Sequence, residues 1–295
     1  MKYFIFVISV ITLALAGCGH SKKTSIADSI SFEIKDTSRQ FTFTNKKYGQ
    51  YYGQTNNYFD DGWMGWTLRE QRVFNDYSLT VKGFKLQRNL STSTVSPYQI
   101  ERTYANGLKE RFFFADSLDA IIIELEGAGS GEVCFSIDNI ALGGTPQLKN
   151  NYVLYGLSQI ISNYNLYVTS DANIKDFQMQ NGSLQLFLEG TDKIKIMLLA
   201  SDKKENLKSI FDNSALLIAQ KKARIEKMLS ESYFKTNDKS FDKAMMWAKV
   251  SIDALVTTQD VKGIFAGLPW FNNNWGRDTF IALPGATCSV RNMDI

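Results

Sequence analysis

Apolar and polar residues alternate over much of residues 31–200, and this period of two predicts short β-strands. The alternation is plain at 41–44 and 77–81, and an apolar segment at 194–198 ends the region. Many short strands separated by regular turn signals are typical of a β-sandwich. We therefore expect a sandwich domain over residues 31–200.

Glycine-containing turns divide this region into predicted hairpins. Asn106-Gly107 separates 100–104 from 108–114, and Asn181-Gly182 stands between two further apolar segments. Residues 121–125 and 133–137, joined by a glycine-rich stretch, predict another hairpin, and Gly83 predicts a bulge.

A helical period replaces the alternation near residue 201. Apolar residues three and four positions apart predict one or two amphipathic linker helices over 201–235. Asn237 or Asp238 is expected to cap a further helix that runs to about Thr258. Its apolar stripe comprises Phe241, Ala244, Met245, Ala248, Ile252 and Leu255, and a second apolar side comprises Met246, Trp247 and Val250. Such a helix needs neighbours on more than one side, as an inner helix of a larger helical assembly has.

The first residues form a targeting signal. Lys2 precedes an apolar segment over 3–13, which is too short for a comfortable membrane span. The sequence Leu15-Ala16-Gly17-Cys18 that follows resembles a bacterial lipobox. This resemblance implies a signal peptide over 1–17, acylation of Cys18 and a tether over 18–30, and a plain signal peptide with an incidental cysteine is the alternative. We expect a lipid-anchored protein of the bacterial cell envelope, on the periplasmic side or in the outer membrane.

Composition and charge exclude several functional classes. The chain has 295 residues, and its 33 basic and 30 acidic side chains give a net charge of +3, so a nucleic-acid partner is not expected. His20, which lies in the tether, is the one histidine of the sequence. Cys134 and Cys288 have neither metal-ligand nor disulfide spacing. We therefore expect no cofactor and no metal site.

The candidate chemistry is concentrated between residues 267 and 285. Trp270, Phe271 and Trp275 flank three consecutive asparagines, and Arg277 and Asp278 follow. Aromatic faces stack on sugar rings, while amides, guanidinium and carboxylate groups can bracket sugar hydroxyls. The alternative is a structural Arg277–Asp278 ion pair at a helix start, with Trp275 in the core.

The segment Trp275-Gly-Arg-Asp-Thr resembles a motif of bacterial glycogen debranching enzymes of the amylo-α-1,6-glucosidase type, and residues 100–107 are similar to the sandwich of that family. The resemblance implies a β-sandwich, linker helices and, over 236–295, the start of an (α/α)6 barrel. It also implies inverting hydrolysis of α-1,6 branch points in glycogen- or starch-like α-glucans. In those relatives the Arg-Asp pair binds the terminal glucose. This role falls on Arg277 and Asp278, with Trp275 in the pocket wall and Trp270 or Phe271 stacked on a sugar.

The catalytic acid and base of the relatives lie downstream of this motif. The resemblance therefore implies an N-terminal fragment with a truncated barrel that is inactive alone, although Asp278 is a minority candidate for the acid. Two other functions stay open. One is a non-catalytic α-glucan-binding envelope lipoprotein, and the other is a purely structural envelope lipoprotein.

Overall fold

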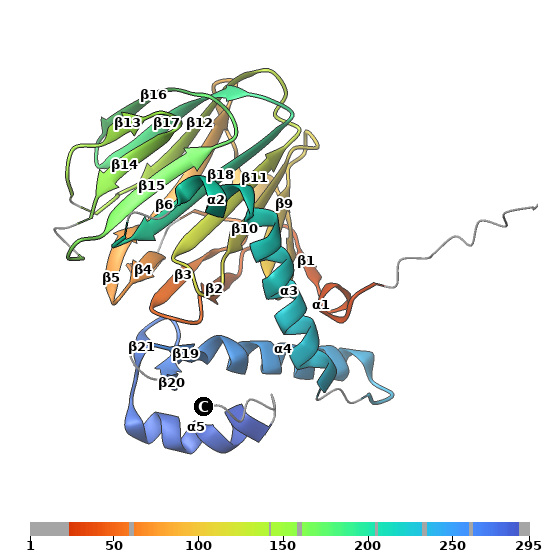
Figure 1. The fold of residues 1–295 in the computed structure, drawn as a ribbon. Helices are drawn as coiled ribbons and strands as arrows, with labels where there is room; N and C mark the ends of the chain where they lie inside the picture. Colours follow the sequence, from red (N-terminus) through yellow and green to blue (C-terminus); the bar gives the residue numbers. More distant parts are fainter. Residues whose placement is uncertain are drawn as a thin grey trace, which may run out of the picture.

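Antiparallel sheets provide most of the regular secondary structure of the described residues, as the alternating pattern predicts (Figure 1). The computed structural model describes residues 24–58, 62–141, 143–157, 161–203, 206–231, 235–259 and 262–288. The predicted signal peptide and Cys18 lie outside these residues. Within them, no helix is both long and apolar enough to cross a membrane.

Three sheets occupy the region between Phe32 and Ser201. In spatial order, the nine-stranded sheet contains β1 (Phe32–Ile34), β8 (Thr92–Val95), β9 (Gln99–Thr103), β10 (Lys109–Phe114), β11 (Ala120–Glu126), β18 (Lys193–Ser201), β15 (Asn165–Ser170), β14 (Tyr152–Gly156) and β13 (Gln147–Lys149). The five-stranded sheet contains β16 (Ile174–Gln180), β17 (Ser183–Gly190), β12 (Gly131–Asp138), β6 (Asp76–Val81) and β7 (Phe84–Lys85). The four-stranded sheet contains β2 (Gln40–Thr44), β3 (Gly49–Gln54), β4 (Gly65–Leu68) and β5 (Gln71–Phe74).

Successive residues of a strand face opposite sides, and this places the core between the sheets. In β11, Ile121 and Ile123 belong to a large apolar cluster that also contains residues of the five-stranded and four-stranded sheets. Ile122 points to the other side, where the linker helices α2 (Leu207–Asp212) and α3 (Ser214–Glu231) cover the sheet. Strand β11 is therefore apolar on both sides, which explains its continuous run of isoleucines.

The turn predictions are right at two positions and wrong at two others. Asn106-Gly107 joins β9 to β10, and Asn181-Gly182 joins β16 to β17. The hairpin predicted over 121–137 does not form, because β11 pairs with β10 and β18 whereas β12 pairs with β6 and β17. Gly83 is not a bulge. With Lys82 it forms the two-residue turn between β6 and β7, where both residues have positive φ.

The second helical region begins where the sequence predicts. Asp238 caps α4 (Lys239–Leu255), and its side chain accepts hydrogen bonds from the backbone nitrogens of Ser240 and Phe241. The helix ends three residues earlier than expected, because Val256–Thr258 forms strand β19. Strand β19 pairs with β20 (Lys262–Gly267), which pairs with β21 (Phe271–Asn274) before helix α5 (Gly276–Cys288).

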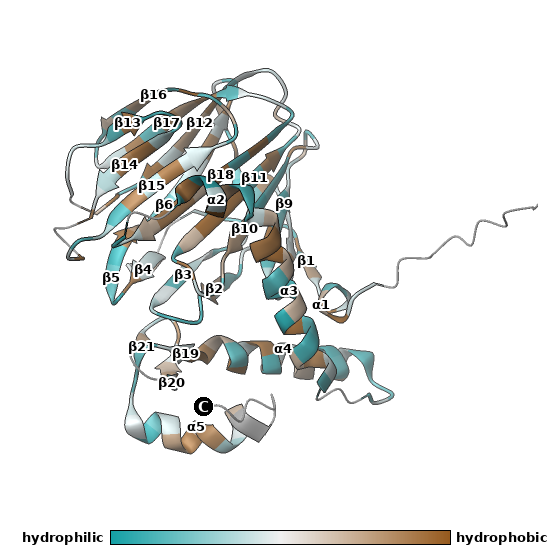
Figure 2. Ribbon diagram, in the orientation of Figure 1, coloured by the Kyte–Doolittle hydropathy of each residue, from teal (hydrophilic) through white to brown (hydrophobic). Residues whose placement is uncertain are grey.

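The two apolar sides of α4 are buried to different extents. Met246, Trp247 and Val250 pack against a cluster formed by α3 and the short helix α1 (Ile26–Ser29). On the predicted stripe, Phe241 is 48% exposed. Apolar residues are visible along both α4 and α5 in Figure 2. Ala244 and Ala248 of the stripe are exposed as well, whereas Ile252 packs against the same cluster as Trp247, so the first half of the stripe is the less buried part.

Candidate functional site

The Arg277–Asp278 pair lies in the first turn of α5, directly after strand β21. This helix start is held on the β20–β21 hairpin by Thr279. Its backbone nitrogen donates to the carbonyl oxygen of Trp275 at 2.8 Å, and its hydroxyl group donates to the carbonyl oxygen of Ile264 at 3.2 Å. The Thr279 hydroxyl group therefore ties the start of α5, and with it the pair, to strand β20.

The two charged side chains are open to solvent. Arg277 Nε lies 4.0 Å from Asp278 Oδ2, and the side chains are 80% and 37% exposed. An exposed ion pair at this separation contributes little to the free energy of unfolding. Both groups stay accessible to a ligand, and their position at a helix start also agrees with the structural alternative.

The three aromatic rings of the segment are also exposed. Trp270, Phe271 and Trp275 are 49%, 57% and 52% exposed, so Trp275 is not part of the core. The indole nitrogen of Trp275 donates a hydrogen bond to Asn273 Oδ1. Large apolar rings that remain half exposed beside polar groups provide the two kinds of contact that sugars need.

The sandwich supports this segment through the β2–β3 hairpin. Gln50 Nε2 donates to the carbonyl oxygen of Pro269 at 3.2 Å, one residue before Trp270. The backbone nitrogen of Thr258 donates to the carbonyl oxygen of Lys46 at 2.8 Å. Hairpin contacts therefore reach both β19 and the loop that carries Trp270.

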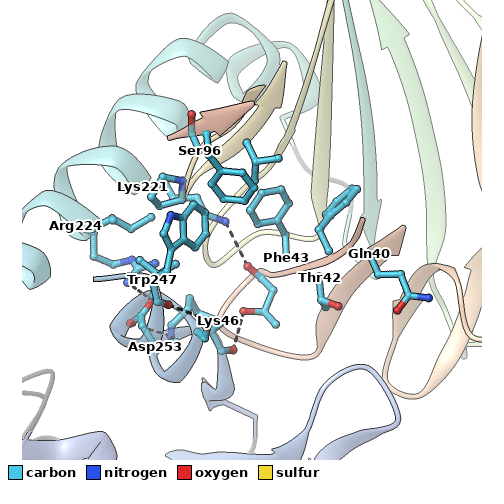
Figure 3. Close-up of a pocket in the computed structure, with 18 residues that line it drawn as sticks. Gln40, Thr42, Phe43, Lys46, Ser96, Lys221, Arg224, Trp247 and Asp253 are labelled. Atoms are coloured by element: carbon cyan, nitrogen blue, oxygen red, sulfur yellow. Dashed lines mark hydrogen bonds and ion pairs between the residues drawn. The ribbon is translucent and has the colours of Figure 1, made fainter. Parts of the chain in front are cut away.

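A charged network seats α4 on the same hairpin (Figure 3). Lys46 Nζ lies 3.2 Å from Asp253 Oδ1, and Arg224 bridges Asp253 and Asp116 at 2.8 and 2.7 Å. Lys221 completes the network at 3.1 Å from Asp116. The cleft beside these groups, which Trp247 also lines, has a volume of about 340 Å³.

Burial and neighbouring charges together shift the pKa values of two members of this network. It lowers the pKa of Lys46 to about 8, although the carboxylate of Asp253 acts in the opposite direction. Burial also disfavours ionised Asp116, but Lys221 and Arg224 hold its pKa below the ordinary value. Because these charges pair with one another, the network acts mainly as a joint between the sandwich and α4.

Sequence reasoning missed a second network, which lies inside the sandwich. Glu110 Oε1 accepts from Arg102 Nη1 at 2.5 Å, and the hydroxyl groups of Tyr77 and Tyr104 also donate to this carboxylate. Although burial opposes it, the two guanidinium groups of Arg102 and Arg88 lower the pKa of Glu110 to about 2. Arg102 and Tyr104 belong to the segment 100–107. They follow Ile100 at intervals of two residues, and this alternation places their side chains on the same buried side of the strand, where a charged group needs a partner.

The described residues hold no group of three His, Cys, Asp or Glu side chains arranged as metal ligands. Cys134 is half-buried in β12, and burial raises the pKa of its thiol to about 11. A thiol with a raised pKa is a poor nucleophile at neutral pH.

Comparison with known proteins adds one family. Residues 230–294 match the model of the family described as amylo-alpha-1,6-glucosidase. A search of curated protein sequences found no match.

Solved structures of glycoside hydrolases are similar to the chain in fold. A family GH92 inverting mannosidase from Bacteroides thetaiotaomicron has 13% sequence identity and a TM-score of 0.50, over 73% of this chain and 37% of its own. A bacterial glucoamylase complexed with acarbose has 11% identity and a TM-score of 0.49, over 87% of this chain and 49% of its own. The chain thus spans less than half the length of these two proteins. The segment that carries the exposed rings and the Arg277–Asp278 pair is similar to the amylo-alpha-1,6-glucosidase family, and the chain resembles a glycoside hydrolase.

Proposed function

We propose that this chain is part of a glycoside hydrolase that acts on α-1,6 branch points of glycogen- or starch-like α-glucans with inversion of configuration. The family match over residues 230–294, which contains the exposed motif, carries the proposal. In this proposal residues 236–295 contribute the first helices of an (α/α)6 barrel. The exposed apolar residues of α4 and α5 support that assignment, because inner helices of a barrel need neighbours on several sides.

The proposed role of the Arg277–Asp278 pair is to bind the terminal sugar. A carboxylate accepts hydrogen bonds from two hydroxyl groups, and a guanidinium group donates in a fixed planar geometry. Together they can select one arrangement of hydroxyl groups on a ring. Trp275 would form a wall of the pocket, and Trp270 or Phe271 would stack on a sugar face.

Replacement of Asp278 tests this role with little change in side-chain volume. Hydrogen bonds to a charged group contribute about 1.5–3 kcal/mol, so Asp278→Asn should weaken α-glucan binding about tenfold or more. Calorimetric titration with a branched α-glucan oligosaccharide measures this, beside an assay of glucose release. Glu189→Gln, an exposed acidic residue of β17, is the matched control. Unchanged affinity in Asp278→Asn would show that the pair is structural.

A non-catalytic α-glucan-binding envelope lipoprotein is the second candidate, and one observation favours it. The half-exposed rings of Trp270, Phe271 and Trp275 and the solvent-open Arg277–Asp278 pair can bind a sugar without any reaction. Binding of α-glucan without glucose release by the purified protein would support this candidate over the enzyme.

A further inference from the structure

A second cleft lies where the sandwich meets strand β19, and it is chemically different from the cleft beside α4. Its volume is about 450 Å³, within the range of small-molecule sites. Tyr48, Arg69, Asp119, Tyr164 and Gln259 are among the residues that line it. These residues come from five separate parts of the chain, four of them loops or turns of the sandwich.

Two tyrosine rings and one guanidinium group form the wall of this cleft. The guanidinium carbon of Arg69 lies 4.2 Å from the centre of the Tyr48 ring, and the side chain of Arg69 also hydrogen-bonds that of Tyr164. Both rings are only partly buried. A cation held against an aromatic face keeps its orientation, so the ring and the guanidinium group present a wall of fixed geometry to a ligand.

The charges of the cleft are almost balanced. Lys47, Arg69 and Lys203 oppose Asp119 and Asp202. Such a site does not select an anion or a cation strongly, whereas paired donors and acceptors beside aromatic rings suit a neutral ligand with many hydroxyl groups. The chemistry therefore fits a saccharide.

The backbone around the cleft adopts a conformation that side chains disfavour. The turn Arg69-Glu70 joins β4 to β5 with φ of 47° and 64°. Equivalent left-handed turns at Lys82-Gly83 and Asn181-Gly182 contain glycine, the residue that this conformation favours. A non-glycine pair at such a turn is unfavourable for folding, and such positions are common at functional sites. The conformation of this turn places the Arg69 side chain in the cleft.

The cleft is adjacent to the segment that carries the motif. Gln259 lines the cleft, and its Nε2 donates to the carbonyl oxygen of Asn272 at 3.4 Å. Asn272 belongs to β21, the strand directly before Trp275 and the Arg277–Asp278 pair. A polymer bound at the motif could therefore extend onto the sandwich through this contact.

We propose that this cleft is a saccharide-binding site of the sandwich that holds a part of the α-glucan distant from the Arg277–Asp278 pair. The choice of α-glucan as the ligand rests on the proposed function. The site would give long chains an affinity that short ones lack, because a long chain can contact the motif and the cleft at the same time.

Calorimetric titration of the full chain with maltose and maltoheptaose tests the proposal. We expect Arg69→Gly and Tyr48→Ala to weaken binding of maltoheptaose about tenfold and to leave binding of maltose unchanged. Glycine tolerates the left-handed turn, so the thermal midpoint of Arg69→Gly should not fall, and misfolding cannot explain the lost affinity. Lys82→Gly makes the same backbone change outside the cleft and should leave both affinities unchanged.

The outcomes separate this proposal from the proposed function. Unchanged maltoheptaose affinity in Arg69→Gly, or a wild-type chain that does not bind maltoheptaose, overturns the saccharide cleft. Loss of binding in Arg69→Gly together with unchanged binding in Asp278→Asn supports the cleft and contradicts the role of the motif. A weakening of both sugars by Asp278→Asn, with the longer sugar alone affected by Arg69→Gly, supports both.

Discussion

Gln50 Nε2 donates a hydrogen bond of 3.2 Å to the carbonyl oxygen of Pro269, a residue 219 positions further along the chain. Gln50 lies in β3 of the sandwich and is buried, and Pro269 precedes the exposed Trp270. This contact links strand β3 of the sandwich with the loop before the candidate sugar-binding motif. The geometry of that loop therefore depends on the sandwich.

Gln50→Ala should loosen the loop without unfolding the sandwich. Loss of one buried hydrogen bond costs about 1 kcal/mol, and here it leaves the Pro269 carbonyl group without its sandwich donor. We expect faster amide hydrogen exchange over residues 262–274, measured by mass spectrometry. Gln71→Ala, at an exposed position of β5, is the control. Equal exchange rates in both variants would contradict the supporting role of Gln50.

Glu110→Gln should destabilise the sandwich strongly. Removing the negative charge leaves the buried guanidinium group of Arg102 without its negatively charged partner, and breaking a buried ion pair in this way costs roughly 3–5 kcal/mol. Urea denaturation measures the change in the free energy of unfolding. Glu101→Gln is the control, because Glu101 pairs with Arg111 at a partly exposed position, where the cost should be about 1 kcal/mol or less. Equal effects of the two substitutions would refute this account.

Asp119→Asn should change the pH dependence of stability. Burial raises the pKa of Asp119 to about 6, above its ordinary value of 3.8. The folded state therefore binds a proton that the unfolded state has lost, so the stabilisation is present below pH 3.8 and disappears as the pH rises through 6. At pH 7.5 the variant should be more stable than the wild type by up to about 3 kcal/mol, because one pKa unit corresponds to about 1.4 kcal/mol.

Thermal denaturation of wild type and Asp119→Asn across the acidic and neutral range measures this difference. The advantage of the variant should shrink toward pH 4, because the folded wild type then carries the proton and the unfolded chain also begins to bind it. Asp202→Asn, at an exposed neighbouring position, is the control. An advantage that is the same at pH 4 and at pH 7.5 would argue against a buried titrating carboxyl group.

Cys18→Ser should release the protein from the membrane fraction or leave it unprocessed. The prediction rests on the lipobox-like sequence Leu15-Ala16-Gly17-Cys18 after a short apolar segment. Acyl chains attached to this cysteine would anchor the protein stably. Mass spectrometry of the mature N-terminus is the direct measurement, and a correctly processed but unmodified Cys18 would exclude the anchor.

The sequence predicts individual elements of this fold better than it predicts their partners. Alternation identifies a strand because one side of it is buried and the other is more exposed. The sequence therefore predicts β9, β10, β16 and β17 together with the turns that join them. It cannot say which sheet a strand joins. The glycine-rich stretch over 127–131 is compatible with a hairpin, but in the structure it crosses from the nine-stranded sheet to the five-stranded one.

The end of α4 and the surroundings of the motif show the same limit. Val256 continues the helical spacing of Ile252, and only its pairing with Ile264 in β20 makes it a strand residue. The exposed rings near residue 275 follow from local composition. The contact between Gln50 and Pro269 cannot be predicted in this way, because no local sequence pattern indicates a contact between two such distant parts of a chain.

The β2–β3 hairpin sets a condition for exchanging parts between related proteins. A chimera that joined a foreign sandwich to this C-terminal segment at residue 235 would keep the covalent order but would lose Lys46 and Gln50. The donor would have to supply both side chains at matching positions, or the graft would hold the loop before Trp270 loosely. A chimera of this kind is therefore constrained by residues 44–50, although these residues lie far in sequence from the junction at residue 235.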